Sequence, residues 1–223
     1  DGYNFTVYRH QYANPQSIAC DISRCVTVDD SGRVWIGTRE GFSLYNRDQD
    51  TFSNYFYKEN GYKATVTCIA PMNKDYLMLG TTSGVLLFDI GKERILNDTL
   101  PHPLHLLRPT AMVRQSDKIY IGVEKGLYVY SLANGTLEKL VDMPKATRIH
   151  SVFCQMFTRI WIATEGEGLY MYDTKSKELK NYRHEDGYSG LNSNYVRSLA
   201  VDQENRLWVG TYGGLNIYEG GKD

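Results

Sequence analysis

Short apolar stretches alternate with clusters of glycine, aspartate, asparagine and serine along the whole chain. One stretch recurs at intervals of 41 to 47 residues: a large apolar residue, then isoleucine, leucine or valine, then glycine or alanine. It begins at Trp35, Met78, Tyr120, Trp161 and Trp208. A glycine follows each copy, at Gly41, Gly84, Gly126, Gly168 and Gly214, and an aromatic residue stands four positions later, at Tyr45, Phe88, Tyr130, Tyr172 and Tyr218. Five copies in one register predict a repeat protein.

Each repeat has the pattern of four antiparallel strands. Residues 34–38 form a short apolar stretch, and residues 42–45 alternate between apolar and polar side chains. Gly41 lies between the two segments, which is typical of a tight hairpin. Another strand opens at a small residue ten positions before the recurring stretch, at Cys25, Cys68, Thr110, Ser151 and Ser198. Phe52 and Tyr55 mark a fourth strand in the first repeat. Repeats of about 40–45 residues with four strands are typical of β-propeller blades.

We therefore predict one all-β domain, residues 1–223, folded as a β-propeller of five four-stranded blades. The blades are expected at about residues 23–65, 66–108, 109–148, 149–195 and 196–218. The fifth repeat ends after its third strand, and residues 5–8 have the spacing of Phe52 and Tyr55. These N-terminal residues are expected to complete the last blade and close the ring. The alternative is an open fragment of a seven-bladed propeller.

Composition narrows the functional classes. The 223 residues carry 25 Lys+Arg against 26 Asp+Glu, a formal charge of -1, which favours no nucleic-acid partner. The sequence has no apolar run of the ~20 residues that a membrane helix needs. Four cysteines stand at scattered spacings without a CxxC pair, which disfavours a zinc site. The start at Asp1, without an initiator methionine, suggests a mature or excised piece of a longer protein.

Residues 190–199, followed by residues 206–211 and Gly214-Leu215, resemble the two-component regulator propeller repeat, and residues 34–41 repeat its core. This family forms the periplasmic sensor region of hybrid two-component regulators in gut Bacteroidetes. It usually has two seven-bladed propellers ahead of a β-sandwich, a membrane helix and a histidine kinase. The resemblance implies that the parent is a histidine kinase of the inner membrane, that the chain is periplasmic, and that it senses oligosaccharides. It also implies contacts with other receptor domains and a receptor homodimer.

The sequence leaves three functions open. The first is a non-catalytic, ligand-binding sensor, which we favour. The second is a propeller enzyme, similar to streptogramin lyases or cleaving glycosides. The third is a protein-docking platform for receptor dimerisation. The residues that open the first strands are Cys, Cys, Thr, Ser and Ser, none of them a general acid or base at neutral pH. We expect no catalytic set, no metal site and no cofactor.

A ligand is expected on the loop face of the propeller, where a rigid scaffold presents turns between strands. The candidate residues are polar or planar and come from turns at two neighbouring ends of the predicted ring: Arg39, Tyr188, Asn192, Asn194 and Tyr212. Tyrosine rings stack on sugars, and arginine forks two hydrogen bonds to a hydroxyl pair or a carboxylate. Asn192 and Asn194 are equally well explained as residues that shape the loop.

Other candidates have simpler explanations. Glu165 and Glu167 could form an acid–base pair, but a solvated turn explains them better. His102 and His105 flank Pro103, which blocks the helix that a paired metal site would use. Cys25 and Cys68 are expected to be small packing residues. The sequons at Asn4, Asn97 and Asn134 carry little meaning in a bacterial protein.

Overall fold

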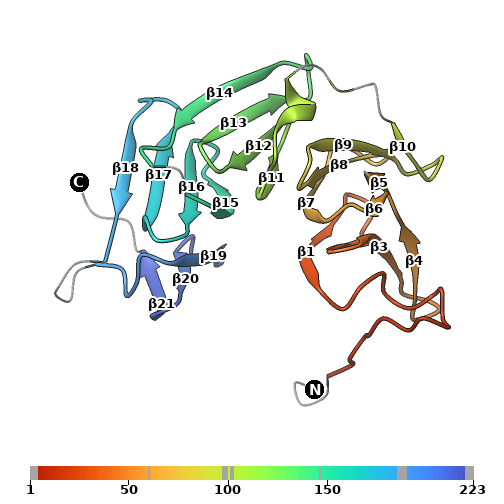
Figure 1. Ribbon diagram of the computed structural model, residues 1–223. Coiled ribbons are helices and arrows are strands. Elements are labelled where there is room, and N and C mark those ends of the chain that lie inside the picture. The colour runs from red at the N-terminus through yellow and green to blue at the C-terminus, as the bar shows by residue number, and fades with distance from the viewer. Residues whose placement is uncertain are drawn as a thin grey trace. The chain divides into compact units, whose positions relative to one another are not determined.

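The computed structural model describes residues 5–59, 61–96, 100, 103–145, 147–184 and 190–218. In these residues the regular elements are β-strands and one short 3-10 helix, η1 (Leu104–Leu106) (Figure 1). The chain divides into two compact units, Asp1–Arg108 and Pro109–Asp223. His102, Tyr188, Asn4 and Asn97, which the sequence singled out, lie outside the described residues.

The first unit contains two four-stranded antiparallel sheets and a small hairpin. The first sheet has the order β1-β2-β3-β4, with β1 (Ser23–Val28), β2 (Val34–Thr38), β3 (Gly41–Asn46) and β4 (Thr51–Tyr55). The second sheet consists of β7 (Val66–Pro71), β8 (Tyr76–Thr81), β9 (Val85–Asp89) and β10 (Arg94–Leu96). The hairpin pairs β5 (Lys58–Glu59) with β6 (Tyr62–Lys63).

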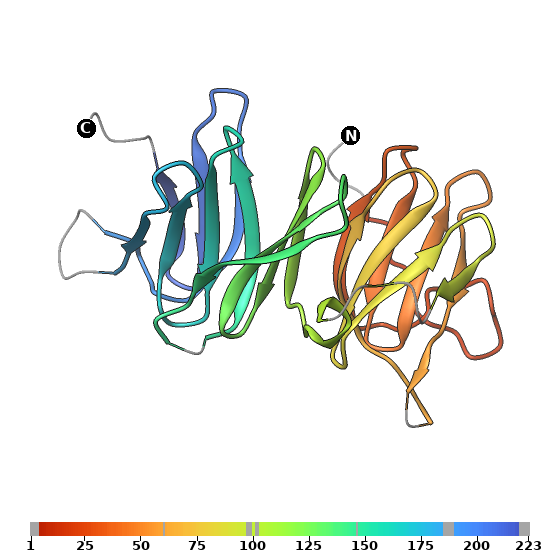
Figure 2. The ribbon, with the colours of Figure 1, turned by 90° about the horizontal axis from the view of Figure 1, so that it is seen from above.

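The second unit contains three antiparallel sheets. The third sheet of the chain has β11 (Ala111–Gln115), β12 (Lys118–Val123), β13 (Gly126–Ser131) and β14 (Leu137–Asp142). The fourth has β15 (Ile149–Gln155), β16 (Arg159–Thr164), β17 (Leu169–Asp173) and β18 (Leu179–Tyr182). The fifth has three strands in the described residues, β19 (Val196–Val201), β20 (Leu207–Thr211) and β21 (Gly214–Tyr218). Within each unit the twisted sheets follow one another along the chain (Figure 2).

The repeated glycine explains why each second and third strand form a tight hairpin. In the first sheet Gly41 pairs with Thr38 and has φ 89°, a conformation that side chains rarely adopt. A Cβ atom at this position would lie 2.3 Å from the backbone oxygen of Tyr55 on β4. The close approach of β4 therefore requires glycine at the turn.

The predicted fold class, an all-β chain of five propeller blades, is confirmed.

Apolar side chains between successive sheets form the core of each unit. In the first unit, Trp35 of the first sheet is fully buried against Val66, Leu77 and Phe88 of the second sheet. In the second unit, Trp161 of the fourth sheet is fully buried against Val196, Leu207 and Val209 of the fifth sheet. The large residues of the repeat thus fill the space between neighbouring sheets of each unit.

Residues 5–8 lie outside any strand, so the prediction that they form the fourth strand of the fifth sheet is wrong for the described residues. Contacts within the first unit hold this segment instead. The hydroxyl of Tyr8 donates to Asp50 Oδ1 at 2.5 Å and lies 3.2 Å from the hydroxyl of Tyr45. The ring of Tyr8 packs edge-on against Phe52 with 5.2 Å between ring centroids.

Trp208 is half-buried, whereas Trp35 and Trp161 are fully buried. Their equivalent positions in the repeat predict that all three tryptophans are buried between blades, and this prediction is wrong for the last one. Trp35 and Trp161 each belong to a sheet that another sheet of the same unit follows and covers. Trp208 belongs to the fifth sheet, which is the last sheet of its unit.

Candidate ligand-binding site

Four of the five sheets have a β-bulge near the start of their first strand. The register shifts between Ser23 and Cys25, Val66 and Cys68, Ile149 and Ser151, and Val196 and Ser198. The extra residue in each bulge is Arg24, Thr67, His150 or Arg197, immediately before the small residue of the repeat. A bulge redirects the side chain of the extra residue. In these four sheets the repeat therefore presents one variable side chain on a constant backbone.

In the second unit the bulged residues of two neighbouring sheets meet. Nη1 of Arg197 lies 2.6 Å from Nε2 of His150. Glu165, in the turn between β16 and β17, has its carboxylate oxygens 3.6 Å from Arg197 Nη2 and 3.7 Å from His150 Nε2. Burial lowers the pKa of His150, and the charge of Arg197 lowers it further, against the opposing effect of Glu165. Because an arginine side chain can only donate, His150 accepts a hydrogen bond from Arg197.

Two tyrosines stack beside this cluster. The rings of Tyr195 and Tyr212 lie 5.6 Å apart with an angle of 21° between their planes, and they are 46% and 66% exposed. The guanidinium carbon of Arg197 lies 4.2 Å from the centre of the Tyr212 ring, and Arg197 Nη2 donates to the Tyr212 hydroxyl. Gly166 has φ 93°, a backbone conformation that favours glycine, and a Cβ there would make ordinary contact with the Tyr195 ring at 3.7 Å. The cluster thus combines exposed aromatic surface with fixed donors and acceptors.

Glu167 belongs to a different cluster. Its carboxylate accepts from Arg183 Nη1 at 2.6 Å and from Lys145 Nζ at 3.3 Å. The hydrogen bond from Arg183 is the main reason why the pKa of Glu167 lies below its usual value. Glu165 and Glu167 therefore have separate partners, and the pair of carboxylates considered from the sequence is not formed.

A loop between β18 and β19 supports the tyrosine pair. Asn194 Oδ1 accepts from the backbone nitrogen of His184 at 2.8 Å, and His184 Nδ1 lies 2.7 Å from the backbone oxygen of Leu191. The backbone oxygen of Asn194 accepts from the nitrogens of Gly166 and Gly168. Asn192 receives its support through its backbone nitrogen, which donates to Asn216 Oδ1 at 3.2 Å. Asn194 is thus a loop-shaping residue.

The loop that enters the first sheet repeats this bonding pattern. His10 donates its backbone N–H to Asp21 Oδ1 at 2.7 Å, and its Nδ1 lies 2.9 Å from the backbone oxygen of Ile18. The backbone nitrogen of Ala19 donates to Ser43 Oγ at 3.1 Å. His10, Ile18 and Asp21 of the first unit therefore hold positions equivalent to those of His184, Leu191 and Asn194 in the second.

The equivalence also relates two of the predicted site residues. Arg39 donates its backbone N–H to Ile22, and Tyr212 donates to Tyr195 in the same way. Arg39 is exposed and lines a pocket of about 490 Å³ in the first unit, together with His10, Tyr12, Cys20, Asp21, Glu40 and Lys63. Arg39 and Tyr212 thus hold corresponding turn positions in different units. Asn192, Asn194 and Tyr212 belong to one loop cluster of the second unit.

His150, Tyr195 and Arg197 belong to the site but were not singled out from the sequence. The available signal was positional: each of the bulged residues precedes the repeating small residue, and its identity varies between repeats. Without the bulge, simple alternation assigns that position to the ordinary pleat of a strand. Only the register of the folded strands shows that His150 and Arg197 meet.

The cysteines behave as packing residues. Burial raises the pKa of Cys25 to about 11 and also raises the pKa of the fully buried Cys68. Sγ of Cys25 lies close to Gly37, where an added Cβ would be 2.5 Å away. Within the part of the chain that the structure describes, no three His, Cys, Asp or Glu side chains gather as metal ligands would. None of the described helices has the length and apolar character to cross a membrane.

A family model supports the resemblance seen in the sequence. Residues 190–213 match the model described as "Two component regulator propeller". The chain is also 39% identical over 59 residues to Histidine kinase P4 of Formosa agariphila, an alignment that spans 26% of this chain and 4% of that protein.

Solved structures of similar fold include extracellular domains of putative hybrid two component systems and a surface component of a secretion system. The extracellular domain of the putative hybrid two component system BT3049 from B. thetaiotaomicron has a TM-score of 0.62 and 24% identity, over 97% of this chain and 36% of that one. The corresponding domain of BT4673 has a TM-score of 0.54 and 19% identity, over 96% and 40%. PorZ of the Porphyromonas gingivalis type-IX secretion system has a TM-score of 0.62 and 16% identity, over 88% and 32%.

The chain thus spans between about a third and two fifths of these solved structures and a small part of the matched histidine kinase. The matched segment, residues 190–213, includes the loop that supports Tyr195 and the turn that carries Tyr212. This chain therefore carries the two component regulator propeller repeat, as its sequence predicted.

Proposed function

We propose that this chain is a non-catalytic, ligand-binding part of the periplasmic sensor region of a two-component regulator, and that it binds an oligosaccharide. The observation that carries the proposal is the cluster of Tyr195, Tyr212 and Arg197 beside a hydrogen-bonded loop. The fold shared with extracellular domains of hybrid two component systems supports the sensor role. The parent protein is proposed to be a histidine kinase of the inner membrane that works as a homodimer.

The side chains of the cluster suit a sugar. Tyrosine offers an aromatic surface at a low cost in conformational entropy. Arg197 and His150 supply N–H donors, and Glu165 supplies a carboxylate acceptor, so that hydroxyl groups of either polarity find partners. The mutual contacts of Arg197, His150 and Glu165 hold these groups in place before a ligand arrives. Such preorganisation reduces the free-energy cost of binding.

Calorimetry of the chain against a panel of plant and host oligosaccharides tests the proposal. We expect one glycan class to bind, and we expect Tyr212→Ala and Arg197→Ala each to weaken binding by about tenfold, since each removes a contact worth about 1.4 kcal/mol. Arg39→Ala measures the contribution of the equivalent turn in the first unit. Met156→Ser, in the turn at the opposite end of the fourth sheet, is the control and should keep full affinity.

Three results would contradict the proposal. Wild-type affinity in both Tyr212→Ala and Arg197→Ala would show that this cluster is not the binding site. Release of new reducing ends during the titration would show that the protein is a glycoside-cleaving enzyme. Failure of every glycan in the panel to bind would remove oligosaccharides as the ligand class of this chain.

A further inference from the structure

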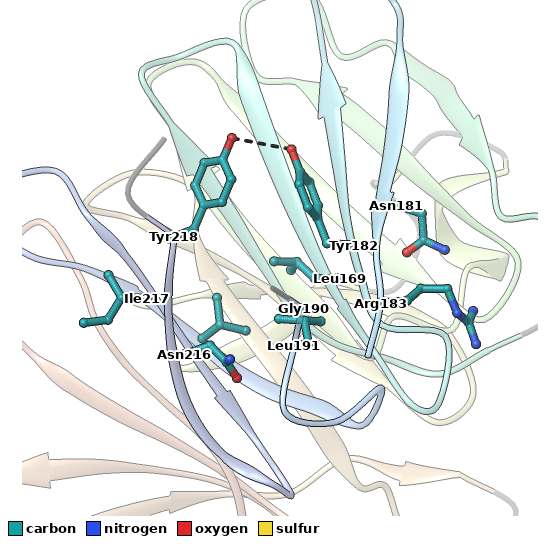
Figure 3. Close-up of a pocket in the computed structure, with 10 residues that line it drawn as sticks. Leu169, Asn181, Tyr182, Arg183, Gly190, Leu191, Asn216, Ile217 and Tyr218 are labelled. Carbon is teal, nitrogen blue, oxygen red and sulfur yellow. Dashed lines mark hydrogen bonds between the residues drawn. The ribbon is translucent and has the colours of Figure 1, made fainter. Parts of the chain in front are cut away.

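Two pockets, one in each unit, are lined by an arginine, but the two arginines differ in their partners. In the second unit, Figure 3 shows Arg183 beside a pocket of about 440 Å³, and Nη1 of this arginine donates to Glu167 at 2.6 Å. In the first unit, Arg39 lines the pocket of about 490 Å³ and has no ion-pair partner among the described residues. The charge of Arg39 is therefore available to a ligand.

The backbone around Arg39 is repeated in the fourth and fifth sheets. In each of the three sheets a threonine ends the second strand and pairs with the residue before the bulge; these threonines are Thr38, Thr164 and Thr211. The turn residue that follows the threonine donates its backbone N–H to the residue two positions before the bulged one, at 3.0, 2.9 and 3.1 Å. The three sheets therefore place the bulged residue and the turn residue in the same way.

In the second unit the side chains at these two positions touch and complement each other. In the fourth sheet the bulged His150 has Nε2 3.7 Å from a carboxylate oxygen of the turn residue Glu165. In the fifth sheet the bulged Arg197 donates to the hydroxyl of the turn residue Tyr212 and lies 4.2 Å from the centre of its ring. The shared backbone thus brings the bulged side chain and the turn side chain into contact, and each pair matches a donor with an acceptor.

The first sheet has two arginines at these positions, Arg24 as the bulged residue and Arg39 as the turn residue. Both are exposed, and within the part of the chain that the structure describes neither guanidinium has an ion-pair partner. The carboxylates next to them in the sequence are engaged elsewhere, since Asp21 accepts a backbone N–H at 2.7 Å and Glu40 accepts from Lys63 at 3.0 Å. Like charges on neighbouring positions repel, and an anion between them removes the repulsion.

The pocket that Arg39 lines also offers a surface for a ring. Tyr12 lines it and is 99% exposed, and its ring lies edge-on to the His10 ring with 5.0 Å between the ring centroids. Ile22, on the same wall as Arg39 through their backbone hydrogen bond, is 42% exposed. An exposed tyrosine ring packs well against the apolar face of a sugar ring. The pocket therefore combines a place for a ring with a neighbouring place for an anionic group.

We propose that Arg24 and Arg39 bind the carboxylate or sulfate group of an acidic sugar whose ring packs against Tyr12 in the adjoining pocket. Guanidinium groups bind such oxyanions through paired N–H donors, and these charge-assisted hydrogen bonds are about twice as strong as neutral ones. The ligand class, a sugar, rests on the proposed function, but the site is a second one in the other unit. Variants of Arg24 and Arg39 therefore test it separately from the Tyr212 cluster.

Calorimetry of the whole chain with glucuronate, glucose 6-sulfate and glucose tests the proposal. We expect both acidic sugars to bind at least about tenfold more tightly than glucose, and inorganic sulfate to bind at least about tenfold more weakly than glucose 6-sulfate. Arg24→Gln and Arg39→Gln should each weaken binding of the acidic sugars at least about tenfold. Arg47→Gln, which removes an exposed arginine at the opposite end of the first sheet, is the matched control and should keep full affinity.

Arg24→Glu is the converse variant. It replaces two like charges by a pair of opposite charges, so the urea midpoint should rise above that of the wild-type chain while binding of the acidic sugars is lost. Adding glucose 6-sulfate should raise the urea midpoint of the wild-type chain and leave that of Arg24→Glu unchanged, because only the former binds the ligand.

Three outcomes would overturn the proposal. Failure of both acidic sugars to bind, or binding no tighter than that of glucose, would show that the arginines select no anion. Inorganic sulfate as tight as glucose 6-sulfate would make this a site for a free anion without a sugar. Full affinity for the acidic sugars in both glutamine variants, with a loss in Tyr212→Ala, would place binding at the Tyr212 cluster. The opposite pattern would support the arginine site and count against that cluster.

Discussion

The first and the last sheets of the chain share their hydrogen bonds but differ in how much of them is covered. In both, an aspartate at the end of the first strand or just beyond it, Asp29 or Asp202, accepts from the indole nitrogen of the tryptophan six residues later, at 2.8 and 2.7 Å. In both, the intervening arginine donates Nε to the same carboxylate at 2.7 Å. The fourth sheet keeps the bond with a neutral acceptor, since Trp161 donates to Gln155 Oε1 at 2.8 Å.

The difference between these sheets lies in their neighbours. Trp35 is fully buried under the second sheet, whereas Trp208 is half-buried. The entering loops likewise keep the same bonds but present different side chains, Ile22 and Arg39 in the first unit against Tyr195 and Tyr212 in the second. The comparison teaches that the repeat specifies the local scaffold, while packing and surface chemistry depend on what lies beside each copy.

Truncation of the two tryptophans should give the largest effect and sharpen this comparison most. Trp35→Ala is expected to lower the free energy of unfolding by about 3–5 kcal/mol, as for a fully buried large aromatic residue. Trp208→Ala should cost clearly less, because part of its ring already contacts water in the folded state. Urea unfolding followed by circular dichroism measures both. Equal costs for the two variants would show that the neighbouring sheet does not determine the contribution of the tryptophan.

Low pH should weaken the tryptophan hydrogen bonds to the charged acceptors Asp29 and Asp202 but not the bond to the neutral acceptor Gln155. Partial burial opposes ionisation of Asp202, but hydrogen bonds from Trp208 and Arg206 outweigh this and lower its pKa from 3.8 to about 2. The pKa of Asp29 is also lowered, because bonds from Trp35 and Arg33 outweigh its burial. A lowered pKa in the folded state stabilises the protein above the unfolded value, and the stabilisation is lost as the pH falls through the folded value.

We therefore expect the urea midpoint to decrease as the pH is lowered from about 4 to about 2, the unfolded and folded pKa values of Asp202. Asp202→Asn should make the urea midpoint depend less steeply on pH in that range, since asparagine keeps an acceptor and removes the titrating charge. Gln155→Glu, which introduces a carboxylate at the matching position of the fourth sheet, is the converse variant and should steepen it. An unchanged slope in Asp202→Asn would mean that other carboxylates dominate acid unfolding.

The loop scaffold should give the smallest effect. Asn194→Ala removes the acceptor for the backbone of His184 and is expected to cost about 1 kcal/mol, the typical net value of one hydrogen bond. Asn194→Asp keeps Oδ1 and should be nearly neutral, because Asp21 performs the same role in the first unit. Thermal melts of the two variants provide the measurement. A loss of stability in Asn194→Asp as large as in Asn194→Ala would break the equivalence of the two loops.

The sequence predicted the strands well because their signals are local. The turn glycine at Gly41 and the aromatic residue at Tyr45 are determined by contacts within one sheet. Strand β10 of the second sheet forms at the position that β4 holds in the first, with Ile95 opposite Phe88 as Phe52 is opposite Tyr45. The site was predicted less completely. Tyr212 and Asn194 were identified from their turns, but Tyr195, Arg197 and His150 come together only across two sheets.

The sequence by itself determined the repeat, the strand order within each sheet and the family of the repeat, since these depend on spacing, turn chemistry and alternation along one short segment. The tertiary structure decided which tryptophan is covered, which bulged residues meet at a common site, and that residues 5–8 lie against the first sheet through Tyr8. The physical reason is that burial and side-chain contacts between sheets depend on neighbours far apart in the chain. A repeated sequence pattern determines the local structure of each copy but does not determine which residues pack against it.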